Sequence, residues 1–460
     1  MSRGAALISD YSTTRVPAER KSPIVTDVIF AVLLVSCVVW PTRLEVGPLR
    51  WYTVPFIALV FFFLFGYAIR LRGLLKKWVP VAAVIVVVGI YCWYGFSAYR
   101  ALCFTSYVLL AVLGYSFVTS RQQLMTLLDV LIGAFAVLGA LGVVEALFHY
   151  NIFDAISHTT VEYYGANSIR FGLARSRGVS DLAINNCFYY LLALGMAIYR
   201  ISTSENKVYP VVCYVLIAAG AVCTVSRGPI AVMIATQLVL ALRAGIIKNI
   251  KRMLIVVGLV LAFFFTAYIL FPDSLGIALD SFNTMLLAMF DTSAAASLSS
   301  EGIGGSGQRA NLYAWVASYM YGHEFLGLGP DAQFIYLMSN GVLKESLENA
   351  YLGRWFHTGY FGLCASLVFF GSIAVVMLRR IWRSAPFESE RGWRLSFGFA
   401  LAVCYLGYLV CGFVADFGQE IRLVYLLIGI FVAYESMLEP SATWVARRAR
   451  TDNVLRTRVP

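Results

Sequence analysis

The chain of 460 residues is 60% hydrophobic and only 13% charged, with a mean hydropathy of +0.76. This composition excludes a water-soluble globular protein and predicts a polytopic membrane protein. The formal net charge of +11 is that of many nucleic-acid-binding proteins. Here, however, the basic residues lie in the connections between apolar runs and in the tails, so the charge indicates the membrane topology. Nucleic acid is therefore excluded as a partner.

Apolar runs long enough to cross a bilayer as helices, which takes about 20 residues each, recur along the chain. We expect about twelve of them, although the two runs on either side of Ser226-Arg227-Gly228 also fit a single broken span. The sequence therefore predicts an all-α membrane protein. The expected spans are 25–42, 51–70, 77–96, 98–118, 124–148, 183–200, 208–225, 229–244, 253–271, 355–378, 394–412 and 421–438.

Most of the 36 Lys and Arg residues fall in alternate connections and in the two tails. The positive-inside rule places these segments and both termini in the cytoplasm. We therefore expect a cytoplasmic tail over 1–24, one membrane domain over 25–438 and a basic cytoplasmic tail over 439–460. The two longest connections, 149–182 and 272–354, then lie on the outer face, the second between spans nine and ten.

Metal-binding and cofactor-binding patterns are absent from the sequence. The nine cysteines lie within or at the ends of spans without a CxxC pair, which is typical of packing residues. The four histidines have no ligand spacing, and no Gly-rich phosphate loop occurs. The first outer loop, 41–50, has a single acidic residue, Glu45. The sequence therefore predicts a protein without a metal or cofactor.

The outer connection 272–354 has internal structure of its own. Asp291–Gly307 is rich in Ser, Ala and Gly, which indicates a linker or lid. Helical spacing follows over Gln308–Val316, then a turn at Gly327–Asp331 and a second helical piece over Glu345–Phe356 that continues into the tenth span. The first helix is expected to have one apolar face, made by Leu312, Trp315, Val316 and Tyr319. An amphipathic cap on the bilayer would show the same periodicity.

Arginines on the expected outer face run against the topological trend. Arg227 lies in Ser226-Arg227-Gly228-Pro229, which interrupts an apolar stretch, and an arginine near membrane depth costs several kcal/mol unless it is paired or hydrated. Arg170, Arg175 and Arg177 precede the sixth span, and guanidinium groups bind phosphate and diphosphate bidentately. The alternatives are an Arg227 that snorkels to the interface and charge balance with acidic residues nearby.

Three further polar residues near the end of the outer connection are candidates for chemistry. Glu348, followed by Asn349, could act as a general base toward a hydroxyl group, or it could simply pair with Arg354 on the surface. Earlier in the connection, Arg309 opens the first helix, where a cation opposes the helix dipole. An unfavourable charge at that position suggests another use for it.

Taken together, these motifs resemble the O-antigen ligase and O-antigen polymerase superfamily, bacterial membrane enzymes that act on undecaprenyl-diphosphate-linked glycans. The resemblance covers roughly residues 165–375. It rests on Thr224–Gly228, on Gly307–Trp315 followed by Gly327-Leu328-Gly329, and on Glu348-Asn349-x9-Gly359-x2-Gly362. Ligases of this superfamily typically have His-Asn where this chain has Glu348-Asn349. That departure favours a polymerase over a ligase.

The resemblance implies a GT-C-like, metal-independent, inverting glycosyltransferase of the inner membrane that takes part in O-antigen or exopolysaccharide biosynthesis. Its partners would be a polyprenyl-diphosphate-linked glycan donor, a glycan acceptor and membrane lipid, with a chain-length regulator as a further candidate. Arg227, with Arg175 or Arg177 and with Arg309, would hold the diphosphate. Glu348 would be the base, supported by Asn349, Arg354 and Tyr351, and the tyrosine ring could also stack on sugar or belong to an interfacial aromatic belt. An O-antigen ligase and a non-catalytic flippase for lipid-linked oligosaccharide remain the alternatives.

Overall fold

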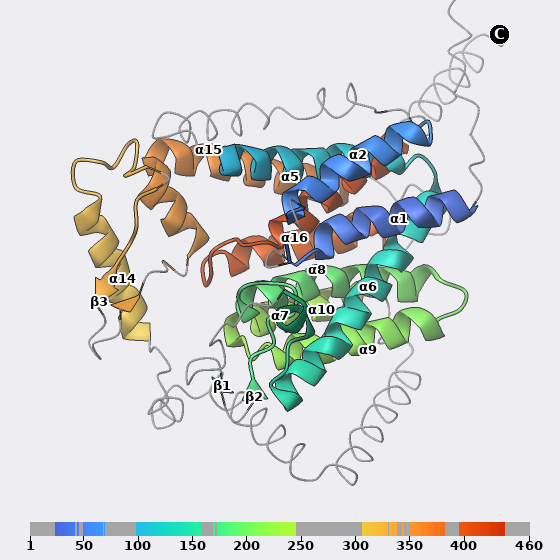
Figure 1. Ribbon diagram of the computed structural model, residues 1–460, viewed down its shortest axis with the longest axis horizontal. Coiled ribbons are helices and arrows are strands. Elements are labelled where there is room, and N and C mark those ends of the chain that lie inside the picture. Colours follow the sequence, from blue (N-terminus) through green and yellow to red (C-terminus); the bar gives the residue numbers. More distant parts are fainter. Residues whose placement is uncertain are drawn as a thin grey trace, which may run out of the picture.

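The computed structural model describes residues 24–41, 44–45, 49–67, 69, 98–157, 169–170, 173–244, 306–329, 331–337, 343–344, 347, 349–381 and 395–437. Over these residues the chain is almost wholly helical (Figure 1), so the predicted all-α fold class is confirmed. The expected spans 77–96 and 253–271, both tails and most of Asp291–Gly307 lie outside the described residues.

A helix occupies each of the other expected spans. The helices are α1 (Ile24–Val39), η2 (Trp51–Thr53), α2 (Val54–Leu64), α5 (Ala98–Phe117), α6 (Arg121–Phe148), α7 (Ile152–Ser157), α8 (Ala183–Thr203), α9 (Val208–Cys223), α10 (Arg227–Arg243), α14 (Ser306–Tyr319), α15 (Ala350–Ile381), α16 (Phe397–Cys411) and a last helix over residues 421–437. Two short antiparallel pairs join β1 (Ile169–Arg170) to β2 (Leu173–Ala174) and β3 (Tyr336–Leu337) to β4 (Leu343–Lys344).

Two of the described helices, α6 and α15, are long and apolar enough to cross a membrane, each with a mean hydropathy of 2.4 over its most apolar stretch. Shorter apolar helices surround them, α1, α2, α5, α9 and α16 among them. Close packing between helices uses small residues, as in membrane bundles. A methyl group added to Gly220 of α9 would lie only 2.5 Å from the Cα atom of Gly139 in α6. The two backbones therefore touch at this crossing.

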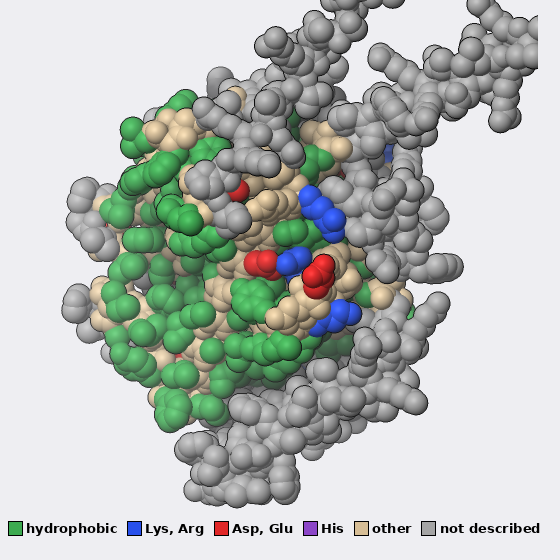
Figure 2. Space-filling model, turned by 90° about the vertical axis from the view of Figure 1, so that its right-hand side faces the viewer, with side chains coloured by type: hydrophobic (Ala, Val, Ile, Leu, Met, Phe, Trp, Pro, Cys, Tyr) green, Lys and Arg blue, Asp and Glu red, His purple; other side chains and the backbone are tan. Residues whose placement is uncertain are grey.

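Each bundle helix that directly follows another, α9 after α8 and α10 after α9 for example, runs in the opposite direction, so the connections gather at two opposite ends (Figure 1). The Arg227 end holds the start of α8, α10 and α15, and α14 lies beside it at the left of the figure. The Arg200 end lies on the right. There, Arg200 joins α8 to α6, because its Nε and Nη2 atoms lie 2.6 and 2.7 Å from the two carboxylate oxygens of Asp129 in α6. Figure 2 views that side and shows a small group of acidic and basic side chains within a mainly hydrophobic face.

Two expectations for the outer connection need correction. The second helical piece was expected from Glu345, but α15 begins at Ala350. The reason is Asn349, whose Oδ1 atom accepts hydrogen bonds from the backbone N–H groups of Tyr351 and Leu352 at 3.0 Å and so starts the helix there. The expected apolar face of the first helix is only partly buried. Leu312 and Val316 are buried, whereas Trp315 and Tyr319 are 45% and 41% exposed.

Helix α15 is broken at Gly359, whose backbone is left-handed (φ 63°, ψ −169°). The segment 323–329 replaces the lost helical hydrogen bonds. Tyr360 and Phe361 donate to the carbonyl oxygens of Glu324 (2.7 Å) and Phe325 (3.2 Å) instead of to Phe356 and His357. Those two vacated carbonyls accept from Leu328 (2.9 Å) and Gly329 (3.0 Å). The break therefore leaves none of these backbone groups without a partner, as an apolar surrounding requires.

This exchange predicts that Gly359→Ala destabilises the protein. A Cβ atom there would lie 2.2 Å from the backbone of Phe325, and the backbone conformation itself costs a non-glycine residue on the order of 1–3 kcal/mol. We expect a clear fall in Tm, measured by thermal unfolding of the purified protein in detergent. Gly371→Ala, in the same helix with open space around it, is the matched control and should leave Tm unchanged or slightly higher. Equal Tm values for the two variants would refute the exchange.

Candidate functional site

The turn between α9 and α10 is strained and carries the predicted Arg227. Val225 has a left-handed backbone (φ 49°), which is rare for a β-branched residue. Such strain persists only where the surroundings enforce it, and it gathers at functional sites. Ser226 ends the turn, and Arg227, partly exposed, is the first residue of α10. The predicted interruption of the apolar sequence is therefore a sharp turn between two helices.

Arg175 is attached to this same turn. Its Nε atom donates to the carbonyl oxygen of Thr224 (3.4 Å), and its Nη2 atom donates to Oγ of Ser226 (3.3 Å). Beside it, the backbone N–H of Ser176 donates to the carbonyl oxygen of Cys223 at 2.9 Å. The structure thus brings Arg175 next to Ser226-Arg227, although the two arginines are far apart in the sequence.

Arg177 has a different environment. Its side chain is only 3% exposed and forms an ion pair with Asp154 of α7. The neighbouring segment is held by Glu145, whose carboxylate accepts from Ser176 Oγ and from the backbone N–H of Gly178, both at 3.0 Å. Arg177 therefore anchors the connection on which Arg175 stands. Arg170 lies in β1.

The start of α15 forms a second part of the site. The Nδ2 atom of Asn349 donates to the hydroxyl oxygen of Tyr313 in α14 (2.8 Å) and to the carbonyl oxygen of Phe413 (3.2 Å). The hydroxyl of Tyr351 donates to the carbonyl oxygen of Leu409 at 2.7 Å. Asn349 and Tyr351 thus join α14 and α15 to the end of α16. Glu348 lies outside the described residues, and Arg309 stands in the first turn of α14.

The turn over residues 412–420, which sequence reasoning missed, joins the two parts. A Cβ atom on Gly228, in the first turn of α10, would lie 3.4 Å from the side chain of Val414. On the other side, Asp416 interacts electrostatically with Arg354 of α15. Burial raises the pKa of the Asp416 carboxyl, and the positive charge of Arg354 opposes that rise. Arg227 and Arg354 are therefore both at the edge of one turn.

Two more charged residues follow, Glu420 at the end of this turn and Arg422 at the start of the last helix, residues 421–437. Burial raises the pKa of Glu420 to about 8. Its Oε1 atom accepts from the backbone N–H of Gly418 at 2.7 Å, whereas Oε2 is buried with no hydrogen-bond partner among the described residues. Arg422 is fully buried. The signal that could have found them is the presence of Asp416, Glu420 and Arg422 within seven residues around the start of the last apolar run.

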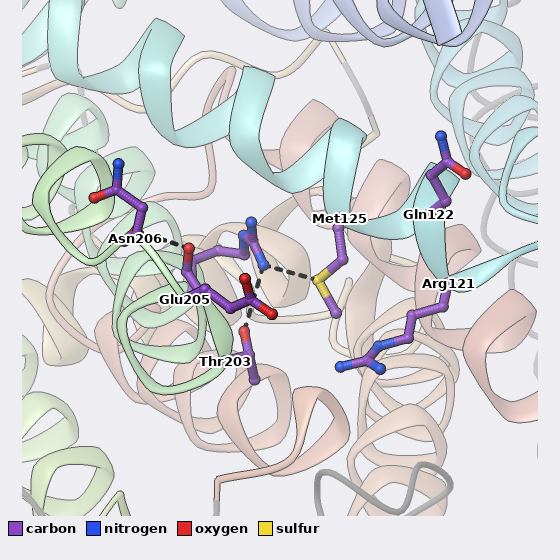
Figure 3. Close-up of a pocket in the computed structure, with 8 residues that line it drawn as sticks. Arg121, Gln122, Met125, Thr203, Glu205 and Asn206 are labelled. Carbon is purple, nitrogen blue, oxygen red and sulfur yellow. Dashed lines mark hydrogen bonds between the residues drawn. The ribbon is translucent and has the colours of Figure 1, made fainter. Parts of the chain in front are cut away.

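A hollow of about 460 Å³ opens at the other end of the bundle (Figure 3). Its lining residues are Arg121, Gln122, Met125, Arg200, Thr203, Ser204, Glu205 and Asn206. The guanidinium of Arg200 is already bound bidentately by Asp129, and its Nη1 atom contacts the sulfur atom of Met125 (3.0 Å). The hollow is remote from the predicted site residues, and we assign no function to it.

Chemically, the Arg227 end combines fixed cations with two carboxyl groups, those of Asp416 and the buried Glu420, at one end of an apolar bundle. Arg175, Arg227 and Arg354 can bind an anion, and Asp416 can exchange a proton because its pKa is raised. Within the described part of the chain, no group of three or more His, Cys, Asp and Glu side chains is arranged to hold a metal ion. No protein-family model and no curated protein matches this chain.

Glu420 predicts how stability depends on pH. Its pKa of about 8 in the folded protein lies above the ordinary value of 4.5, so between these values the folded protein holds a proton that the unfolded chain lacks. Stability should therefore fall as pH rises from about 5 to about 8. Asp416 contributes in the same direction. Tm, recorded against pH for the purified protein, should show this fall.

Glu420→Gln should flatten that profile, because the amide cannot titrate. Glu45→Gln is the control, since Glu45 is an exposed acid paired with Arg50 at 3.2 Å, and it should retain the wild-type slope. An undiminished slope in Glu420→Gln would show that the proton is bound elsewhere.

Proposed function

We propose that this protein is a multi-pass membrane glycosyltransferase that polymerises or transfers undecaprenyl-diphosphate-linked oligosaccharide units during cell-surface polysaccharide biosynthesis. The observation that carries the proposal is the convergence of Arg175, Arg227, Arg354 and Asp416 at one end of an apolar helical bundle. A lipid-linked diphosphate has a polar group attached to a long apolar chain, and this arrangement offers cations where an apolar surface ends.

In the proposed reaction, an acceptor hydroxyl oxygen forms a bond to the anomeric carbon of the donor sugar while the bond from that carbon to the diphosphate oxygen breaks. The polyprenyl diphosphate leaves with the electron pair, and the anomeric centre is inverted. Arg175 and Arg227, with Arg309, stabilise the charge that builds on the leaving group. Arg175 is well suited to this because its hydrogen bonds to the α9–α10 turn fix its position in advance.

Glu348 takes the proton of the acceptor hydroxyl in this proposal. Its neighbour Asn349 is buried and bonded to α14, α15 and the 412–420 turn, which gives the backbone next to the base a fixed position. Tyr351 and Arg354 hold the start of α15 against the end of α16 and the 412–420 turn. Asp416 is a second carboxyl group there, with a raised pKa, and it is the competing candidate for the base.

The proposal also includes a GT-C-like fold with about twelve spans, both termini in the cytoplasm and the Arg227 end on the outer face of a bacterial inner membrane. The helix directions support it, because they place Arg175, Arg227 and Arg354 at one end of the bundle and Arg121 and Arg200 at the other. A chain-length regulator is a further proposed partner. A metal-independent reaction follows from the proposed roles, in which arginines neutralise the leaving diphosphate.

The test is made with the purified protein in lipid and a polyprenyl-diphosphate repeat unit, with products separated on a gel. A polymerase gives a ladder of lengthening glycans, and Glu348→Gln abolishes it while Asp416→Asn lowers it less. The reverse order would assign the base to Asp416. A single addition to a supplied core acceptor would identify a ligase. Transbilayer movement of the substrate with no new glycosidic bond would identify a flippase and overturn the proposal.

Arginine variants test the diphosphate contacts. Arg175→Gln should lower the rate by about 10²–10³-fold, the usual cost of a lost transition-state contact, with Tm close to that of the wild type. Arg177→Gln should instead lower Tm, because it removes the buried guanidinium of the Arg177–Asp154 ion pair. Lys207→Gln, exposed at the Arg200 end, is the control and should change neither rate nor Tm. A fall in rate with Lys207→Gln equal to that with Arg175→Gln would contradict the assignment.

A further inference from the structure

Helix α14 and the turn after it expose a group of apolar and aromatic side chains at the Arg227 end. The largest exposures are those of Tyr321 (85%) and Phe325 (75%). We call this group the aromatic patch, and its members are Tyr313, Trp315, Tyr319, Tyr321, Phe325, Leu326, Tyr360 and Phe361. The sequence has no charged residue from Ala310 to Gly322. A helix that faces water normally has charged residues on its exposed side. This uncharged face is therefore better suited to an apolar environment than to water.

The strip of α14 that adjoins these exposed side chains is already occupied. Leu312, Val316 and Met320 pack in a small separate core with Phe334 of the following segment and Phe356 of α15. The side chains of α14 that pack in a core are therefore already packed, and the aromatic patch is a separate surface beside them. It is the outward face of a unit fixed to α15, and α14 stands beside the first part of that helix (Figure 1).

The patch is continuous with the exposed apolar stripe of α15, one of the two helices able to cross a membrane. The backbone N–H of Phe361 donates to the carbonyl oxygen of Phe325 at 3.2 Å, and the rings of Phe325 and Tyr360 lie 6.2 Å apart. Along α15 the same stripe continues with Val368 (58% exposed) and Val375 (46%), each seven residues on, which is one face of a helix.

The length of the apolar segment of α15 determines the depth at which the patch would lie in a bilayer. A helix rises about 1.5 Å per residue, so the apolar segment from Phe361 to Leu378 is roughly 27 Å long, close to the ~30 Å of a hydrocarbon core. Phe361 therefore stands at one boundary of the hydrocarbon, and Phe325 lies beside it. Tryptophan and tyrosine, which form most of the remaining patch, are the side chains favoured at that boundary.

We propose that the aromatic patch docks on the phospholipid bilayer, with Phe325 and Leu326 inserted at the edge of the hydrocarbon and Trp315 and the tyrosines at the level of the headgroups. The docking holds α14 against the membrane and, through the hydrogen bond from Asn349 to Tyr313, fixes the start of α15 at a set depth. This inference is independent of the glycosyl-transfer proposal, because it rests only on exposure and on continuity with α15.

The experiment places the photoreactive amino acid p-benzoylphenylalanine at position 325 of the full chain in nanodiscs of phosphatidylethanolamine and phosphatidylglycerol. After irradiation, mass spectrometry should find the mass of one phospholipid added, with fragmentation assigning the bond to an acyl chain. The same label at Val368, within the exposed stripe of α15, is the positive control. The label at Glu205, exposed at the Arg200 end, should give no acyl adduct.

Each other outcome counts against the proposal. A cross-linked dimer from position 325 would make the patch an interface between two copies of the chain. A bond to the headgroup alone would exclude insertion into the hydrocarbon. Absence of any lipid adduct at 325 while 368 reacts would show that the patch faces away from the bilayer.

Discussion

The Arg227 end is organised around one buried charge, the guanidinium of Arg422. Its Nη1 atom donates to the carbonyl oxygen of Trp40 (2.8 Å), its Nε atom donates to that of Gln419 (3.1 Å), and its charge lies 4.5 Å from the ring centre of Trp51. A buried cation without such acceptors is strongly destabilising. The connections after α1 and after α16 must therefore stay where these carbonyl groups meet the guanidinium.

That constraint reaches the candidate site through the 412–420 turn. Gln419, fixed by Arg422, also accepts a hydrogen bond from the hydroxyl of Tyr189 in α8 at 2.7 Å. Six residues earlier in the chain, Phe413 accepts from Asn349. Between them stands Asp416, facing Arg354. One buried ion thus holds the backbone on which the two parts of the site depend.

The broken helix α15 shows how an apolar surrounding permits irregular backbone next to this site. Two carbonyl groups and two N–H groups lose their helical partners at Gly359, and the segment 323–329 supplies one partner for each. The two glycine-containing motifs, Gly327-Leu328-Gly329 and Gly359-x2-Gly362, are therefore two sides of one backbone contact. Glycine is needed because a side chain at either side would overlap the other backbone, at 2.2 Å for Gly359 and 2.5 Å for Gly327.

The sequence by itself determined where helices form, because apolar runs and their interruptions are local properties of the chain. It located the break at Ser226–Pro229, the helix that contains Arg309, and the off-trend arginines Arg175 and Arg227. What only the tertiary structure decided is which of these residues share a site. Arg175 meets Ser226 across 51 positions, and Arg422 meets Trp40 across 382.

Burial decided the rest for the same reason. Arg175 and Arg177 are equivalent in the sequence, yet one borders the α9–α10 turn and the other is buried against Asp154. Glu420 attracts no attention in a short connection until packing removes it from water and raises its pKa, and the pKa of Asp416 is raised in the same turn. Desolvation depends on every element packed around a group, and no local pattern in the sequence contains that information.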